Sequence, residues 1–232
     1  MKFINSIKQS IKSLGLINYV LYVFNRILNK LSFNKIRIIK YYFFAQPVPI
    51  DPIIKTIKKR NIKVHEILRD DFIVRQFPRP AKVIEERFNQ QARCFTAIKN
   101  DNEFIGYIWI CENEYLEDEV RCNFIPYPEK DAVWDFDVYI TPENRLSLAF
   151  PLLWDYTNKV LNNKQYSWTI SRISAFNPVS LSVHKKMGAR IVGSAIFFCF
   201  GNVQLLISSI RPFISISLIA IPQLKVNIPE ED

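Results

Sequence analysis

Glycine, histidine and paired cysteines are all scarce in this sequence, and each shortage excludes a class of protein. Only 5 of the 232 residues are glycine, while 49% are hydrophobic and 23% are charged, a composition that favours a folded chain over a disordered one. The two histidines and four cysteines are widely separated, with no C-x-x-C pair. This pattern predicts no metal site and no disulfide framework, and it indicates reduced thiols in a cytoplasmic protein. A chain of this length holds one well-cored domain with an appendage.

Acidic residues are absent from the first fifty positions. The first acid is Asp51, and eight basic residues precede it: Lys2, Lys8, Lys12, Arg26, Lys30, Lys35, Arg37 and Lys40. The rest of the chain carries 23 basic and 22 acidic residues and is almost neutral. The net charge of +9 therefore belongs to the N-terminal segment and has to be explained there.

That basic segment also carries an apolar stripe with helical spacing. Its members recur in steps of three and four: Phe3, Ile7, Ile11, Leu14, Ile17, Leu21, Phe24, Leu28 and Leu31. The spacing predicts a long amphipathic helix, bent at Gly15. The apolar run 14–24 already contains Asn18, so it is too short and too polar to span a membrane, and no signal-peptide cleavage site follows it.

A basic amphipathic helix suits the headgroup region of an anionic membrane, and residues 1–40 are expected to bind such a surface on its cytoplasmic side. Packing of the stripe on the domain itself, or on a second copy in a homodimer, remains open. Nucleic acid is disfavoured because the basic residues are not interleaved for tracking phosphates. Tyr41–Phe44 and residues 47–52 are expected to form an extended linker, which makes 1–50 one organisational segment.

From residue 62 onward, strand and helix patterns alternate and predict a mixed α/β sheet. The expected strands are 62–67, 94–99, 104–111, 119–125, 132–141, 167–174, 191–200 and 203–210, with a further one within 213–221. Helices are expected at 80–88, 142–162 and 178–187, the last closed by Gly188. Residues 191–210 carry no charge, but the Gly201-Asn202 turn signal favours a buried hairpin over a membrane span.

One segment carries a family resemblance residue by residue. Asn177-Pro-Val-Ser-Leu-Ser-Val-His-Lys-Lys-Met-Gly-Ala189 is similar to the N-x-x-(A/S)-x-x-x-(Y/H)-x-K-x-G-F stretch of the GNAT superfamily of acyl-CoA-dependent N-acyltransferases. The matching positions are Asn177, Ser180, His184, Lys186 and Gly188, with Ala189 replacing the usual aromatic residue. The resemblance implies a GNAT domain over 51–211, with a mixed central sheet splayed at the acyl-donor site, and a strand or tail over 212–232.

A second, weaker segment occupies the place of the family's pyrophosphate-binding turn. Val138–Phe150 keeps Pro142 and Arg145, but Leu146, Leu148 and Phe150 stand where glycines are expected. Glycines let phosphates approach the amides at a helix N-terminus. The implied donor is acetyl-CoA or a longer acyl-CoA, bound in an altered pose, or an acyl-carrier-protein thioester. The implied donor contacts are Val138, Tyr139, Ile140, Arg145, Leu146, Ser147, Leu148, Ala149, Asn177 and Ser180.

The resemblance also assigns catalytic roles. His184 stands where the family places its general acid, and Asp137 stands where an acid often receives the amine proton. Alternation predicts that Asp135 and Asp137 project from one face of a central strand, where an acid is either functional or paired to an arginine such as Arg121 or Arg172. Glu119 and Arg121 are expected to share another strand face and contact the acceptor. The alternatives are that His184 is a surface residue and that the acids of 112–119 form a solvated loop.

These features predict transfer of an acyl group from a thioester to a primary amine at the inner membrane surface. The N-terminal helix favours a lipid-like acceptor such as a sphingoid base, as in the GNAT-type bacterial ceramide synthases that the combination resembles. A soluble amine, such as an amino sugar of surface-polysaccharide synthesis, remains open. So does a GNAT-shaped binding protein without turnover.

Overall fold

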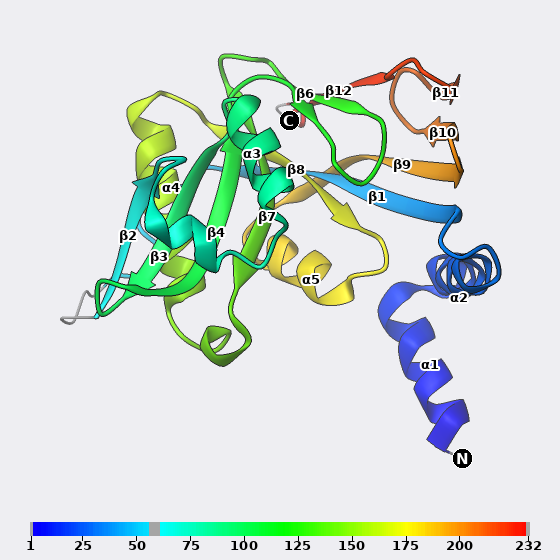
Figure 1. Ribbon diagram of the computed structural model, residues 1–232, viewed down its shortest axis with the longest axis horizontal. Helices are drawn as coiled ribbons and strands as arrows, with labels where there is room; N and C mark the ends of the chain where they lie inside the picture. Colours follow the sequence, from blue (N-terminus) through cyan, green and yellow to red (C-terminus); the bar gives the residue numbers. More distant parts are fainter. Residues whose placement is uncertain (1, 56–60, 231–232) are drawn as a thin grey trace. The chain divides into compact units, whose positions relative to one another are not determined.

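The computed structural model describes residues 2–55 and 61–230 (Figure 1). Met1 and the last two residues, which belong to the predicted N-terminal segment and tail, lie outside the described residues. The chain forms two compact units. Unit 1 comprises Met1–Gln46, Leu116–Ile125 and Ile170–Asp232, and unit 2 comprises Pro47–Tyr115 and Pro126–Thr169. The predicted α/β class is confirmed, because both units combine strands with helices.

Two helices begin unit 1, and a glycine separates them. Helix α1 spans Lys2–Leu14 and α2 spans Leu16–Leu31. The break falls at Gly15, whose φ of 79° is readily adopted only by glycine. Among the described residues, no helix is both long enough and apolar enough to cross a membrane.

Strand β1, Ile36–Pro47, runs through the sheet of unit 1, so the linker prediction for Tyr41–Phe44 is wrong. Tyr41, Phe43 and Phe44 are completely buried. β1 pairs antiparallel with β9 (Arg190–Phe200), and β9 pairs antiparallel with β10 (Val203–Ser208). In Tyr41–Phe44, apolar and polar residues do not alternate, and the run was therefore not recognised as a strand. The alternation is missing because this strand is covered on both faces.

The remaining strands of unit 1 complete this sheet and form a small second one. In the larger sheet the order is β11-β10-β9-β1-β8, with β11 at Ile214–Ser217 and β8 at Trp168–Ser174. The small sheet has the order β12-β6-β5, from Gln223–Asn227, Asn123–Tyr127 and Tyr115–Leu116. The strand predicted over 119–125 therefore begins only at Asn123, and strand β12 was not predicted.

Helix α5, Pro178–Lys186, connects β8 to β9 as the family resemblance implied. Asn177 caps its N-terminus by accepting a hydrogen bond from the Ser180 N–H at 3.1 Å. Pro178 occupies the first turn, where its missing N–H costs nothing. Gly188, with φ of 84°, ends the helix in the left-handed conformation that the sequence predicted.

Unit 2 contains an antiparallel sheet in the order β7-β4-β3-β2. Its strands are β2 (Ile62–Ile67), β3 (Arg93–Lys99), β4 (Glu103–Cys111) and β7 (Ala132–Ile140), close to the predicted ranges. A 3-10 helix, η1 (Phe72–Gln76), and helix α3 (Ala81–Asn89) connect β2 to β3. Trp109, Trp134, Trp154 and Phe95 are fully buried and fill the core of this unit.

The long helix predicted from Pro142 begins later than expected. A 3-10 turn, η2, occupies Pro142–Asn144, and helix α4 spans Ala149–Asn163. Leu148, with φ of −85° and ψ of 9°, is the N-cap, and its side chain makes no capping hydrogen bond. The apolar periodicity continues through this turn, so it does not indicate where α4 begins.

Candidate functional site

His184 lies on the inner side of α5 and is only 6% exposed. Its ring is 6.3 Å from that of Phe44 on β1. Burial lowers the pKa of His184 to about 4. The imidazole is therefore neutral near pH 7, which makes it a poor general acid, and the surface alternative is wrong.

The paired-carboxylate prediction for β7 is wrong because the strand contains a β-bulge. Tyr107 opposes Tyr139 and Trp109 opposes Phe136, so two residues of β7 lie opposite Ile108. Asp137 has a φ of 46° at this bulge. Cross-strand partners share a face, so Asp135, opposite Ile110, lies on one face of the sheet. The Asp137 carboxylate lies on the other face, where Tyr107 donates a hydrogen bond to it at 2.9 Å.

Two arginines also hold Asp137. Arg79 donates to both carboxylate oxygens, and Arg87 Nη1 donates to Oδ2 at 2.6 Å. Burial raises the pKa of Asp137, but the hydrogen bonds and charges of Arg79 and Arg87 outweigh this and lower it overall. A carboxylate held in this way is a weak base. These partners could not be predicted from the sequence, because Arg79 and Arg87 lie 58 and 50 positions from Asp137.

The turn expected to bind the donor phosphates has few free amides. The Ala149 N–H donates to Ser147 Oγ at 3.1 Å, and Pro151 has no N–H, so two of the first three positions of α4 offer none. Leu146 and Arg145 are exposed, and Leu146 is 102% accessible, so its side chain does not cover the helix end. Upstream, Val138, Tyr139 and Ile140 are half-buried at the end of β7.

Asn177 and Ser180, the other predicted donor contacts, are engaged with each other in the cap of α5. That hydrogen bond explains both residues structurally. The Ser180 N–H is consequently not a free donor for a phosphate. Their role in binding a thioester therefore remains a proposal.

Glu119 and Arg121 do not share a strand face, because residues 118–121 form a bend before β6. The Arg121 guanidinium donates to the carbonyl oxygens of Asn202, Ser217 and Leu218, and Gln204 bonds the Arg121 backbone. Arg121 thus joins three segments of unit 1. Glu119 accepts a hydrogen bond from the Tyr41 hydroxyl.

A buried ion pair that the sequence did not reveal lies beside Tyr41. Arg172 on β8 donates to the buried Glu117 carboxylate at 2.5 and 2.6 Å. Its guanidinium lies 4.7 Å from the centre of the Tyr41 ring. Arg172 is one of the arginines expected to pair with a β7 acid, and its acidic partners in unit 1 are Glu117 and, at 3.8 Å, Glu119.

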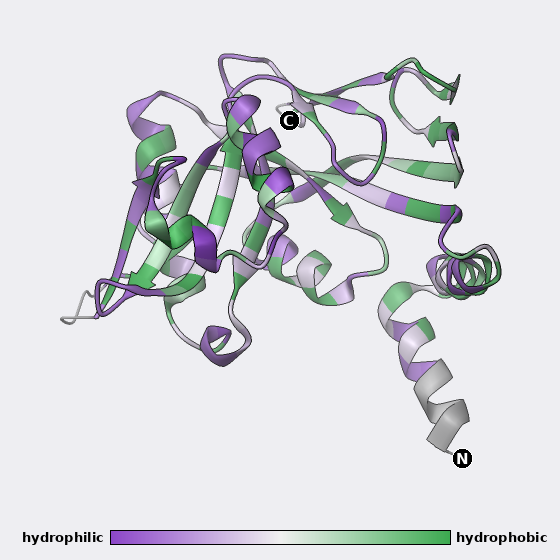
Figure 2. Cartoon of the chain, in the orientation of Figure 1, coloured by the Kyte–Doolittle hydropathy of each residue, from purple (hydrophilic) through white to green (hydrophobic). Residues whose placement is uncertain are grey.

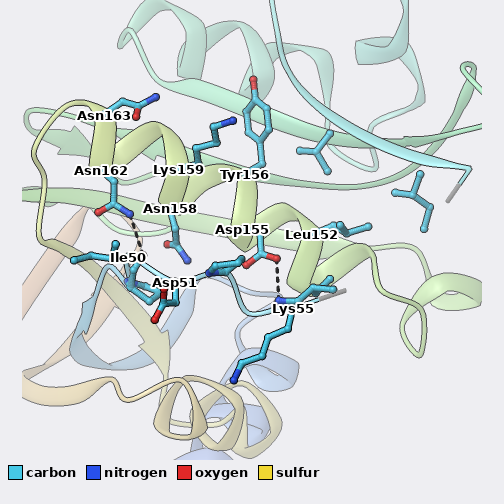
Figure 3. Close-up of a pocket in the computed structure, with 15 residues that line it drawn as sticks. Ile50, Asp51, Lys55, Leu152, Asp155, Tyr156, Asn158, Lys159, Asn162 and Asn163 are labelled. Atoms are coloured by element: carbon cyan, nitrogen blue, oxygen red, sulfur yellow. Dashed lines mark hydrogen bonds between the residues drawn. The ribbon is translucent and has the colours of Figure 1, made fainter. Parts of the chain in front are cut away.

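A cavity of about 620 Å³ lies along α4 in unit 2 (Figure 3). Residues 49–55 border it, held by Asp155, which accepts from the Ile53 and Ile54 N–H groups, and by Asn162, which donates to the Pro49 carbonyl. Asn158, 4% exposed, also lines the cavity, and its amide oxygen and nitrogen have no hydrogen-bond partner among the described residues. The cavity contains none of the residues predicted to bind the donor or catalyse the reaction. Within 2–55 and 61–230, no cluster of side chains has the composition of a metal site.

No family model matches the sequence, and no curated protein is significantly similar to it. Among solved structures, the chain is similar to a functionally unknown conserved protein from Staphylococcus epidermidis, at 11% identity and a TM-score of 0.48. That alignment covers 75% of this chain and 66% of the other.

Two further solved structures are similar to the chain at the same level. One is a tandem GNAT protein from the clavulanic acid biosynthesis pathway, at 13% identity and a TM-score of 0.47, covering 66% of this chain and 50% of that one. The other is a GCN5-related glucosamine N-acetyltransferase region of a fungal multi-domain β-N-acetylglucosaminidase. It matches at 10% identity and a TM-score of 0.49, over 73% of this chain and 22% of that one. The chain spans less than two thirds of each of these three proteins, and values this low transfer no activity or ligand to it.

Proposed function

We propose that this protein is a GNAT-type N-acyltransferase that moves an acyl group from a thioester to a primary amine. The observation that carries the proposal is the segment Asn177–Gly188, which matches the family's pattern and forms a capped helix ending in a left-handed glycine between two strands. The β7–η2–α4 succession of strand, turn and helix supports it from unit 2.

The donor is an acyl-CoA or an acyl carrier protein, and its thioester, rather than its pyrophosphate, supplies most of the recognition. Ser147 and Pro151 reduce the number of amides at the start of α4, which weakens a phosphate site there. The half-buried Val138–Ile140 stretch supplies the candidate backbone N–H for the thioester oxygen. A carrier-protein thioester suits such a site because protein contacts replace phosphate contacts.

The chemistry we propose relies on positioning. A neutral amine attacks the thioester carbonyl, the C–N bond forms, and the C–S bond breaks to release a thiolate. The amine proton passes to water and the thiolate gains a proton from water, because Asp137 is held by two arginines and His184 is neutral. Correct placement of the two reactants provides the rate enhancement.

For the acceptor we propose a lipid-like primary amine, such as a sphingoid base, taken from the inner surface of an anionic membrane. Support comes from the basic, acid-free N-terminal segment and from the exposed apolar residues of α2. Membrane attachment would bring the protein to the surface from which such an amine is taken.

A binding protein without turnover is the second candidate. The same loss of amides at α4 and the same engaged Asp137 favour it. Both candidates have the same fold and bind a thioester at the same site. They differ in that the binding protein forms no acylated product.

Thermal-shift titration of the full chain with acetyl-CoA, palmitoyl-CoA and palmitoyl-carrier protein tests donor binding. We expect stabilisation by at least one thioester, and most by the carrier-protein form. Product formation with sphinganine or glucosamine, followed by mass spectrometry, then separates enzyme from binding protein and lipid from soluble acceptor. His184→Phe is expected to keep turnover. No stabilisation by any thioester would contradict both candidates.

A further inference from the structure

Helix α2 has its amphipathic character reversed with respect to the protein. Its asparagines face the body of unit 1: Asn18 is 9% exposed and bonds Lys40 and Tyr42, and Asn25 Oδ1 accepts from the Ile38 N–H at 2.7 Å. Its apolar residues face outward, with exposed fractions from 49% to 75% for Leu16, Ile17, Val20, Phe24, Ile27 and Leu31. A helix whose outer side faces only water would bury its apolar residues and expose its asparagines.

Strand β11 shows the same reversal. Its serines, Ser215 and Ser217, are half-buried and buried, whereas Ile214 and Ile216 are 68% and 72% exposed. The covered face of the neighbouring strand holds Gln204 and Leu206, which oppose Ser217 and Ser215. The isoleucines therefore project from the uncovered face of the sheet, and apolar residues exposed in such numbers mark an interaction surface.

Strand register joins these two features into one surface. Lys40 of β1, which bonds Asn18 of α2, is the first member of a row that continues through Ile196, Ile207 and Ile214. The adjacent row runs from Ile38 through Phe198 and Leu205 to Ile216. Cross-strand partners lie on one face, so beyond Lys40 these two rows place apolar side chains on that face from the strand beside α2 to the sheet edge. Figure 2 shows the hydrophobic residues of β9, β10 and β11 in green.

Charge identifies what covers this surface. The two segments that form it, 1–50 and 191–222, contain no acidic residue and nine basic ones, namely the eight of 1–50 and Arg211. Arg37 is the exception in placement, because it lies on the other face of β1 and donates to the Glu119 carbonyl oxygen. Two copies of such a surface would repel each other, whereas an anionic bilayer attracts it. An apolar face with basic residues around it is the arrangement of an interfacial membrane-binding element.

We propose that the apolar face of β9–β11 inserts, together with α2, into the surface of an anionic membrane. The contact is thus a sheet face and a helix, rather than the N-terminal helix alone. This inference extends the membrane attachment proposed above and does not depend on acyl transfer.

Sedimentation of the full chain with vesicles of phosphatidylcholine, with or without phosphatidylglycerol, tests the sheet face. Ile214→Thr with Ile216→Thr keeps β-branched residues in the strand and removes apolar surface. We expect binding to anionic vesicles to weaken about tenfold or more. The control, Ile50→Thr with Leu68→Thr, changes two exposed residues of unit 2 and is expected to bind as the unmodified chain does. Equal binding by both double variants would overturn the proposal.

A single labelled cysteine provides a second measurement that does not require the double variant to fold. All four native cysteines are buried, so a polarity-sensitive dye on Ile216→Cys labels one site selectively. We expect a blue shift of emission with anionic vesicles, and an unchanged spectrum would overturn the proposal. Light scattering tests whether a second copy of the chain covers the face instead. A dimer that dissociates in the threonine double variant, while vesicle binding persists, would assign the face to a second copy and overturn the proposal. Loss of acyl transfer with retained vesicle binding would overturn the proposed function alone.

Discussion

Arg87 is 4% exposed and lies against Trp109 and Phe136 while it donates to Asp137. Removing one partner of a buried ion pair costs about 3–5 kcal/mol, and Asp137 would keep Arg79, so the loss should lie at the lower end of this range. We therefore expect Arg87→Met to lower the free energy of unfolding by about 3 kcal/mol, measured by urea denaturation at pH 7. Lys82→Met, at an exposed position of α3, is the control and is expected to change little.

The same pair predicts a dependence on pH. The pKa of Asp137 is lowered in the folded state, so its stabilisation is complete above the unfolded pKa of about 3.9 and is lost as pH falls through the folded pKa. The difference in the free energy of unfolding between Arg87→Met and the unmodified chain should therefore shrink below pH 4. A difference that stays constant down to pH 2 would mean that Arg87 stabilises the fold through packing and not through the charge of Asp137.

His184 gives a second pH prediction, in a higher range. Its folded pKa is about 4, whereas an unfolded histidine titrates near 6.5. Between these values only the unfolded state binds the proton, so stability falls as pH decreases from 6.5 to 4, by about 3 kcal/mol in total. His184→Phe should flatten this part of the stability curve, as measured by urea denaturation at a series of pH values.

At the scale of elements, the pairing of β4 with β7 depends on Gly106. A Cβ at this position would lie 2.6 Å from both the Tyr139 carbonyl oxygen and Ile140 Cδ1, and the oxygen belongs to rigid backbone. Gly106→Ala should cost about 1–3 kcal/mol, as overpacking does in well-packed cores. An added Cβ at Gly15 meets no atom of the described residues within 4 Å, so Gly15→Ala should cost only the strain of its positive φ, about 1 kcal/mol. Thermal unfolding of both variants checks the difference.

Elements with strong periodicity were predictable, and those defined by long-range contacts were not. Strand β2 matches its predicted range, and α5 ends at Gly188 as the cap signal indicated. The bulge at Asp137 escaped prediction because a bulge inserts one residue without changing the local composition. The buried strand Ile36–Pro47 escaped for a related reason, since residues covered on both faces show no alternation.

The candidate site was less predictable than the fold. Its residues had been assigned roles from their place in a motif, whereas their chemistry depends on distant partners. Asp137 is bound by residues 30, 50 and 58 positions away, and the pKa of His184 is lowered by burial, which a motif does not report. The loss of amides at α4 was foreseeable only in part, because Pro151 is visible in the sequence but the Ser147 hydrogen bond is not.

At the scale of the whole molecule, the distribution of charge predicts how the chain binds a membrane. Each basic residue near an anionic surface contributes about 1 kcal/mol, so Lys8, Lys12, Arg26 and Lys30 together contribute at most about 4 kcal/mol. Replacing all four by glutamine should weaken binding to phosphatidylglycerol vesicles by two orders of magnitude or more at low salt, measured by sedimentation. The difference from the unmodified chain should shrink as salt screens the charges. Residual binding should persist, because the apolar residues of α2 and β11 are unchanged. As a control, changing Lys63, Lys82, Lys99 and Lys164 of unit 2 to glutamine removes the same charge elsewhere. An equal loss of vesicle binding in this control would show that net charge, and not this surface, governs attachment.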